Sequence, residues 1–411
     1  MRDVVVVTGV GCLSSLGIGA GIFVDRLLAG QSGIAPVTRF STAGCRSHTA
    51  ALIPGFEPTQ YIEPLKLRRI DEVGRLALVA CRFAAEDARL PTQTGEVGVV
   101  LGSATAGLHS TVTHLQSLVT TGPACVPALG FSNMIGSAAA GLCALEFGWH
   151  GPNLTFAQKQ ASALAAIAFA VGELEQGRVS AFLCGGVDDI EEKFYRVHDR
   201  FRVLSPTDGE PEASRPFHAG RNGFVLGTGG HVVVLETPSS AARRGVVPYG
   251  EILGIGAAAS DCRLNAWPTE PTGQVRAMQR ALAEAGVAPV EVAAVFATAN
   301  ATQALDHVEA VALEQVFGPY GVPVVSLKGA LGEFGAVGAA SLTAALLCLR
   351  RGMLPPTLGC EPRDPLCRVD VTTSARPSAG RIALVNATAD GGAHYCVVVR
   401  AIAPSAVEGT A

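Results

Sequence analysis

The 411-residue chain has few charged side chains and no paired cysteine motif. Charged residues make up 16% of it, against about 25% in an average protein. The net charge of −4 gives no support for nucleic-acid binding. The 11 cysteines stand singly, without a CxxC pair, which argues against a zinc site or a disulfide framework. We therefore expect reduced thiols and a cytoplasmic location.

Long apolar runs and cofactor motifs are also lacking. The longest apolar stretch, near Ala161–Val171, is too short to span a bilayer, and no membrane partner is expected. Neither GxGxxG nor GxxxxGK(S/T) occurs between a strand and a helix, so glycine-rich segments such as Val225–Gly230 indicate tight turns. The nine histidines are dispersed and form no ligand-spaced cluster. We expect neither a metal nor a bound cofactor.

Apolar residues, at 48%, are abundant and recur in short runs that alternate with helical segments, which indicates an α/β fold. The length predicts two halves, 1–240 and 250–402, joined near Thr237–Tyr249 and followed by a disordered tail, 403–411. Predicted strands are Val4–Thr8, Val97–Leu101, Ala181–Cys184, Val232–Leu235, Ala293–Ala297, Val322–Ser326, Ile382–Asn386 and Tyr395–Val399. Predicted helices are Gly74–Ala88, Ser162–Gln176, Gly273–Ala285 and Ala336–Arg350. The paired apolar strands that end each half hint at an internal duplication.

One segment has the form of a nucleophile site without its nucleophile. Residues Gly151–Ala163 predict a strand that turns sharply into an Ala-rich helix. The start of that helix would stabilise a thiolate through the helix dipole, but Gln160 stands there. A carboxamide cannot attack a thioester, so a covalent acyl-enzyme is excluded at this position. Its amide is expected to hydrogen-bond across the pocket and hold it closed.

Seven landmarks, in register along the chain, make the sequence resemble the β-ketoacyl synthase family. They are Val6–Gly11, Gly151-Pro152, Cys184–Asp188, Arg215–Phe217 with Gly223–Val225, Asp306–Gly318, Ser326–Gly329 and Gly335–Arg350. The resemblance covers essentially the whole length. It implies a thiolase-like α/β fold of two duplicated halves in a five-layered α-β-α-β-α arrangement.

The chain departs from active members of that family at every catalytic position. Those members use a Cys and two His, and the matching positions here hold Gln160, Asn300 and Glu333. Lys328 precedes Glu333 by five residues, and we expect the two to form a structural ion pair. The glycine-rich turn that carries a gating Phe in active members reads Ala389–His394. By this resemblance, no residue of the chain keeps a catalytic role in condensation.

A ketosynthase-like chain with these replacements resembles the chain length factor of type II polyketide synthases. That subunit pairs with an intact ketosynthase and shapes the tunnel for the growing chain, whose substrates arrive on a phosphopantetheinylated acyl carrier protein. The alternative is an enzyme that decarboxylates malonyl-carrier protein with Gln in place of Cys. Such domains keep both histidines, whereas Glu333 would repel the malonyl carboxylate and the developing enolate.

The resemblance also places a tunnel and a subunit interface. Residues Gly107–Leu118 predict a helix, with Leu108, Thr111 and Leu115 on one face and Phe194 farther along the tunnel. Spacing alone favours core packing, and the family register favours the tunnel. Aliphatic rather than aromatic residues on this face favour a longer tunnel and a polyene product. The apolar segment Gly130–Gly141 matches the pairing region, where the expected interface residues are Phe131, Asn133, Met134 and Ile135.

Overall fold

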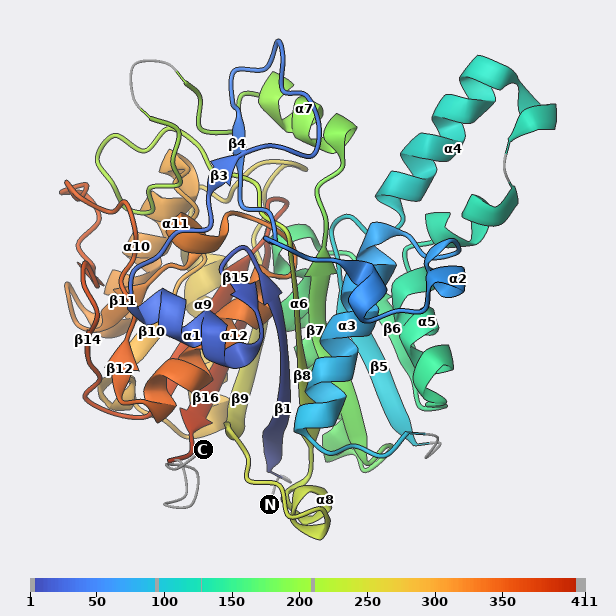
Figure 1. Ribbon diagram of the computed structural model, residues 1–411. Helices are drawn as coiled ribbons and strands as arrows, with labels where there is room; N and C mark the ends of the chain where they lie inside the picture. The colour runs from blue at the N-terminus through green and yellow to red at the C-terminus, as the bar shows by residue number, and fades with distance from the viewer. Residues whose placement is uncertain (1–3, 93–95, 127, 208–210, 404–411) are drawn as a thin grey trace.

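The computed structural model describes residues 4–92, 96–126, 128–207 and 211–403, and its centre is one 12-stranded mixed sheet (Figure 1). The predicted tail, apart from Ala403, lies outside the described residues. The main strands of the first half are β1 (Val5–Ser14), β5 (Val97–Gly102), β6 (Asn153–Phe156), β7 (Ala181–Asp188) and β8 (Gly229–Glu236). Those of the second half are β9 (Gly250–Ala259), β10 (Ala294–Phe296), β11 (Pro323–Val325), β13 (Asp370–Val371), β15 (Ile382–Thr388) and β16 (Ala393–Ala401).

The two halves repeat one strand order, which supports the expected duplication. The first half runs β1-β8-β7-β5-β6 and the second runs β9-β16-β15-β10-β11, with the same parallel and antiparallel pairings. Strands β1 and β9 lie antiparallel at the centre, where Val5 is opposite Ile252 and Val7 is opposite Gly250. The halves are therefore continuous through one sheet.

Helices cover both faces of each half. Those of the first half are α1 (Ala20–Leu28), α2 (Pro64–Leu67), α3 (Glu72–Asp87), α4 (Leu108–Thr121), α5 (Ala138–Phe147), α6 (Ser162–Glu175), α7 (Glu192–Arg200) and α8 (Pro238–Arg243). Those of the second are α9 (Thr272–Ala285), α10 (Gln303–Phe317), α11 (Lys328–Leu331) and α12 (Val337–Arg350). Helices α6 and α12 pack on each other and on strands of both halves, α3 covers β1 and β8, and α9 covers β9 and β16. This is the layered thiolase-like arrangement expected from the sequence.

Close packing of helix against sheet depends on glycine at two positions of β1. A Cβ on Gly9 would lie 2.1 Å from the Ala84 carbonyl oxygen of α3, and one on Gly11 would lie 1.9 Å from that of Ala80. Only glycine allows the backbones to approach this closely, and the helix presents alanines at the same positions.

The remaining strands are two residues long: β2 (Gly17–Ile18), β3 (Ala35–Pro36), β4 (Thr49–Ala50), β12 (Met353–Leu354) and β14 (Arg376–Pro377).

All eight predicted strands and four predicted helices are present, with ends that differ by a few residues in most cases. Strand β1 is longer than expected and runs on to Ser14. The local sequence pattern does not predict strand β9 or the helices α7 and α10, because glycine or charged residues interrupt their apolar positions. Among the described residues, no helix is both long and apolar enough to cross a membrane.

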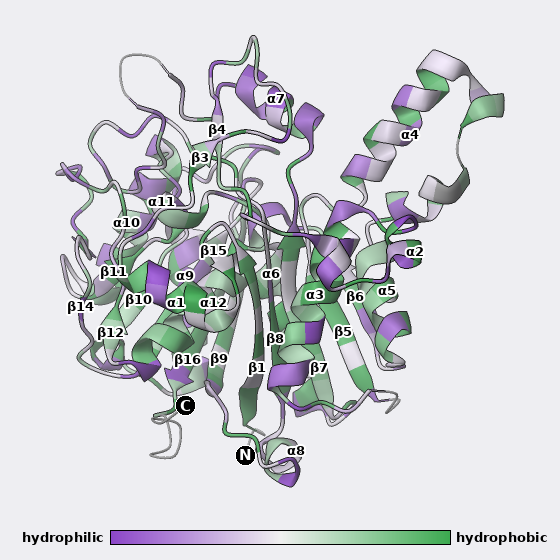
Figure 2. Ribbon diagram, in the orientation of Figure 1, coloured by the Kyte–Doolittle hydropathy of each residue, from purple (hydrophilic) through white to green (hydrophobic). Residues whose placement is uncertain are grey.

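One part of the first half projects from this body. Helix α4 and the adjoining 3-10 segment η3 (Ala128–Met134) extend away from the sheet as an arm and contact each other (Figure 1). No residue of α4 is buried. Apolar and polar residues mix along the arm, whereas the central strands are almost wholly apolar (Figure 2). We call α4 and residues 128–135 the projecting arm.

Candidate functional site

Gln160 lies in a sharp turn between a strand and a helix, as the sequence predicts. Strand β6 ends at Phe156, the short 3-10 turn η4 (Lys159–Ala161) follows, and α6 begins at Ser162. Lys159 has a φ of 50°, which is uncommon for a side chain other than glycine. The Ser162 hydroxyl stabilises the turn, since it accepts from the Gln158 N–H (2.9 Å) and donates to the Lys159 carbonyl (2.6 Å).

The other two replaced positions meet behind this turn in a buried ionic network. Lys328 Nζ lies 2.7 Å from Glu333 Oε2 and donates also to the Thr298 carbonyl at 3.0 Å. The Asn300 Nδ2 donates to Glu333 Oε2 at 2.8 Å. All three side chains are at most 3% exposed. The expected Lys328–Glu333 ion pair is thus present, with Asn300 as its third member.

Two further carboxylates hold the loop that carries Asn300. Asp306 accepts hydrogen bonds from the backbone N–H groups of Phe217, Asn300 and Ala301, at 2.8 to 3.1 Å. Burial raises the pKa of Asp306 to about 7, against the opposing effect of these donors. Glu309 accepts from the N–H groups of Thr298 and Ala299, and burial likewise raises its pKa. The loop is therefore fixed from within the fold.

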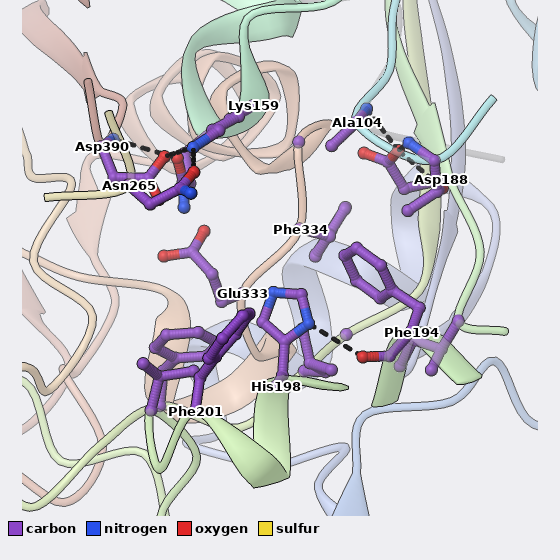
Figure 3. Close-up of a pocket in the computed structure, with 18 of the residues that line it drawn as sticks. Ala104, Lys159, Asp188, Phe194, His198, Phe201, Asn265, Glu333, Phe334 and Asp390 are labelled. Atoms are coloured by element: carbon purple, nitrogen blue, oxygen red, sulfur yellow. Dashed lines mark hydrogen bonds and ion pairs between the residues drawn. The ribbon is translucent and has the colours of Figure 1, made fainter. Parts of the chain in front are cut away.

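A cavity of about 560 Å³ lies between this network, the Gln160 turn and helix α7 (Figure 3). One wall is aromatic. It includes Phe194, Phe201, Phe224, Trp267 and Phe334. His198 lies among them, its ring 4.2 Å from that of Phe194, and burial lowers its pKa. No cysteine is among the described residues that line this cavity.

The opposite side of the cavity is polar. The Gln160 Oε1 accepts a hydrogen bond from the Asp390 N–H at 3.3 Å, so the amide does reach across to the glycine-rich turn. Lys159 Nζ lies 2.7 Å from Asp390 Oδ1 and donates to Asn265 Oδ1 (Figure 3). The expected hydrogen bond across the pocket is thus present, and a cavity remains beside the amide.

This arrangement offers little for covalent or proton-transfer chemistry. The turn presents a carboxamide, and the carboxylate behind it already accepts from Lys328 and Asn300. Both oxygens of that carboxylate are therefore already engaged in hydrogen bonds within the chain. Within the described ranges, no group of three or more His, Cys, Asp or Glu lies close enough to hold a metal ion.

The structure separates the residues predicted for the tunnel. Phe194 lies on α7 in the wall of the cavity, whereas Leu108, Thr111 and Leu115 lie on α4 in the projecting arm and do not line the cavity. Leu115 is 50% exposed. The four residues therefore do not line one cavity in the single chain.

The residues predicted for the interface lie together on the projecting arm. Phe131 is 60% exposed and Ile135 is 57% exposed, while Asn133 and Met134 are half-buried. The Asn133 side chain donates to the Arg69 carbonyl at 2.9 Å, which ties η3 to the loop before α3. The two large apolar side chains at the ends of this stretch face solvent in the single chain.

Sequence reasoning gave no role to several residues of the cavity. Lys159, Asn265 and Asp390 come from three distant segments, and only their tertiary contact reveals an ion pair. His198 and Phe201 follow Phe194 by four and seven positions, the spacing of one helix face. This spacing over residues 194–201 is the sequence signal that could have located the aromatic wall.

Comparison with known proteins gives the family. The beta-ketoacyl synthase N-terminal domain family matches residues 2–241 and the C-terminal domain family matches residues 249–361. The chain belongs to the beta-ketoacyl synthase family. It is similar to a 3-oxoacyl-acyl-carrier-protein synthase 2 of Coxiella burnetii, with 31% identity over 404 residues, 96% of this chain and 98% of the relative.

Two solved structures share the fold over nearly the whole chain. The ishigamide ketosynthase/chain length factor has a TM-score of 0.92 and 29% identity, and a beta-ketoacyl synthase from Burkholderia phymatum has 0.91 and 26%. Each alignment covers 98% of this chain and 100% of the other. The thiolase-like ketosynthase fold is therefore shared with synthases and with a ketosynthase/chain length factor.

Proposed function

We propose that this chain is a non-catalytic chain length factor, which pairs with an active ketosynthase and shapes the tunnel that sets polyketide or polyene length. The observation that carries the proposal is Gln160 at the turn where a nucleophile is needed. Around it the chain has the ketosynthase fold, a strand that turns sharply into a helix, and a cavity beside the turn. The residues at all three catalytic positions, Gln160, Asn300 and Glu333, are replacements.

The ionic network argues against a residual condensation activity. Condensation needs groups that can donate a hydrogen bond or a proton to a developing oxyanion. Asn300 directs its amide to Glu333 instead, and Glu333 is buried with Lys328 at 2.7 Å. An anion that develops here would face a carboxylate whose charge is already matched, so no net positive field remains to stabilise it.

The projecting arm supports a protein partner. Leu115, Val119, Phe131 and Ile135 are all at least half exposed on one arm, which is costly for an isolated chain in water. A ketosynthase that covers the arm would also enclose Leu108 and Thr111 and could join them to one passage. Substrates would arrive on a phosphopantetheinylated acyl carrier protein, mainly at the partner, and the proposal includes no cofactor for this chain.

Co-expression with an intact ketosynthase tests the proposal. The pair should co-purify and make a chain of defined length, while the isolated chain should form no acyl adduct at residue 160. Gln160→Cys alone should not restore condensation, because Asn300 and Glu333 still occupy the histidine positions. Release of acetyl-carrier protein from malonyl-carrier protein, lost in Gln160→Ala, would support the decarboxylase alternative and overturn the proposal.

A further inference from the structure

His198, in the aromatic wall of the cavity, has two ring nitrogens with different surroundings. It lies on α7, and its Nδ1 is 2.9 Å from the Phe194 carbonyl oxygen, one turn earlier on the same helix. Among the residues that the structure describes, none forms a hydrogen bond with the other ring nitrogen, Nε2. Figure 3 shows that nitrogen turned away from the Phe194 carbonyl and toward the interior of the cavity.

The hydrogen bond to Phe194 determines which ring nitrogen carries the proton. A carbonyl oxygen only accepts, so Nδ1 must be the N–H donor. In a neutral imidazole the other nitrogen then has no hydrogen and presents a lone pair. Burial lowers the pKa of His198, and the charges of Asp390 and Lys159, which act in opposite directions, do not reverse this shift. At neutral pH the cavity therefore contains a hydrogen-bond acceptor at Nε2.

Two aromatic side chains fix the orientation of the imidazole ring. The centroid of the Phe194 ring lies 4.2 Å from that of His198, and the centroid of the Phe224 ring lies 6.2 Å away in an edge-on arrangement. A rotation that turned Nε2 elsewhere would break the hydrogen bond of Nδ1 and disturb both ring contacts. The lone pair is therefore held in one direction before any ligand binds, which lowers the entropic cost of binding.

The walls around Nε2 favour a flat, unsaturated ligand. Besides Phe194 and Phe224, the rings of Phe201, Trp267 and Phe334 line the cavity, whose volume of about 560 Å³ lies in the range of small-molecule sites. Aromatic walls bind planar carbon skeletons through stacked and edge-on contacts. A lone pair within such a wall selects a ligand that carries an O–H group, because an acceptor left unpaired after water is displaced costs free energy.

The polar side of the cavity presents a donor. The Gln160 Oε1 accepts from the Asp390 N–H, and no described residue accepts a hydrogen bond from the Gln160 amide nitrogen. That nitrogen carries two hydrogens, which suit an oxygen acceptor on a ligand. An unsaturated molecule with a hydroxyl group and a second oxygen therefore matches both sides of the cavity, whereas a plain hydrocarbon leaves both unpaired.

We propose that His198 is a specificity-determining residue, whose Nε2 accepts a hydrogen bond from a hydroxyl group on a planar, unsaturated ligand packed against the aromatic wall. The ligand class is a phenol or an enol rather than a saturated acyl chain. The inference goes beyond the proposed function, because it concerns the selectivity of this cavity in the single chain and holds with or without a ketosynthase partner.

A pair of probes that differ in one O–H group tests this role. Binding of 2-naphthol and of 2-methoxynaphthalene to the full chain is measured by isothermal titration calorimetry at neutral pH. The methyl ether keeps the rings and loses the donor. We expect 2-naphthol to bind about five- to tenfold more tightly, which is the contribution of one hydrogen bond in a site that excludes water.

Two substitutions separate the lone pair from the shape of the ring. His198→Phe keeps an aromatic ring without an acceptor, so the two probes should bind within about twofold of each other, while the affinity for the ether stays near that of the parent. His198→Gln restores an acceptor oxygen near the position of Nε2 and should keep most of the preference for 2-naphthol. A merely structural role predicts instead that both variants weaken both probes to the same extent.

His150 provides the matched control, because it is exposed and is not among the residues that line the cavity. His150→Phe should leave the preference for 2-naphthol within about twofold of the parent, and circular dichroism of every variant checks that the fold is intact. The proposal is overturned if the parent binds both probes equally or binds neither. It is also overturned if His198→Phe keeps the preference, or if His198→Gln loses it as fully as His198→Phe does.

Discussion

The buried ionic network and the projecting arm differ in how far the chain itself covers and satisfies their side chains. In the network, Lys328, Asn300 and Glu333 are almost wholly buried and satisfy one another. In the arm, Phe131 and Ile135 are more than half exposed. The chain itself satisfies the first region, whereas the second would be covered by the partner that the proposed function requires. Substitutions in the network should therefore change folding stability, and substitutions in the arm should change association.

The largest effect is expected in the network. Lys328→Met leaves the Glu333 carboxylate buried without its cation, which should lower the free energy of unfolding by about 3–5 kcal/mol in chemical denaturation. The double variant Lys328→Met/Glu333→Leu removes both charges and should recover much of that loss. Arg178→Met, at an exposed pair, should cost less than about 1 kcal/mol. If Lys328→Met lowers the free energy of unfolding by as little as this control does, the buried network does not stabilise the fold.

Substitutions in the projecting arm should weaken association with a partner and leave the folding stability of the isolated chain nearly unchanged. Phe131→Asp/Ile135→Asp should weaken binding to a ketosynthase partner at least about 100-fold, roughly 3 kcal/mol, because two apolar contacts are lost and charges are buried. The unfolding free energy of the isolated chain should stay within about 0.5 kcal/mol. Val290→Asp, at a residue 91% exposed elsewhere, is the control and should leave binding unchanged. Sedimentation of mixtures at micromolar concentration measures the binding of each variant to the partner, and chemical denaturation measures its unfolding free energy.

Acid should act on the buried body through its titratable groups: a buried histidine on β8 lowers stability as pH falls, whereas the raised pKa of Asp306, about 7, acts in the opposite direction. His231 on β8 is wholly buried beside Phe23, neither ring nitrogen has a hydrogen-bond partner, and burial lowers its pKa from 6.5 to about 3. Below pH 6.5 the unfolded chain binds a proton that the folded chain does not, so stability falls as pH decreases. The contribution is about 1.4 kcal/mol per pH unit, or about 2 kcal/mol at pH 5.

His231→Leu removes this proton uptake and should flatten the fall in unfolding free energy between pH 7.5 and 5 by that amount. Burial also lowers the pKa of His394 to about 4, so its contribution has the same sign. An unchanged pH dependence in His231→Leu would mean that this histidine is not the source of the acid sensitivity.

Substitutions on α4 should have the smallest effect on folding stability, but they should change the length of the product. Thr111→Trp and Leu115→Trp add volume at exposed or half-exposed positions, so the unfolding free energy of the isolated chain should change by less than about 0.5 kcal/mol. In the assembled pair the same indole should narrow the passage and shorten the product, measured by mass spectrometry. If both variants assemble normally and the product distribution is unchanged, the tunnel does not pass these residues.

The elements of the fold were largely predictable because their signals are local. Buried strands such as β7 and β8 are continuous apolar runs, and α6 and α12 are apolar along most of their length. Helix α7 was harder, since it is short and mostly charged and only one of its faces meets the cavity. The side-by-side placement of β1 and β9, which makes one sheet of two halves, follows from no local pattern.

The sequence by itself determined which chemistry is absent, because residue identity fixes it in any conformation: Gln160 supplies no thiolate, and Asn300 and Glu333 supply no imidazole. The tertiary structure alone decided the size of the cavity, the exposure of the arm and the contact between Gln160 and Asp390, which are 230 positions apart. Those properties depend on how distant segments pack. A local pattern carries no information about which loops meet, and so Lys159 acquires its partners only in the folded chain.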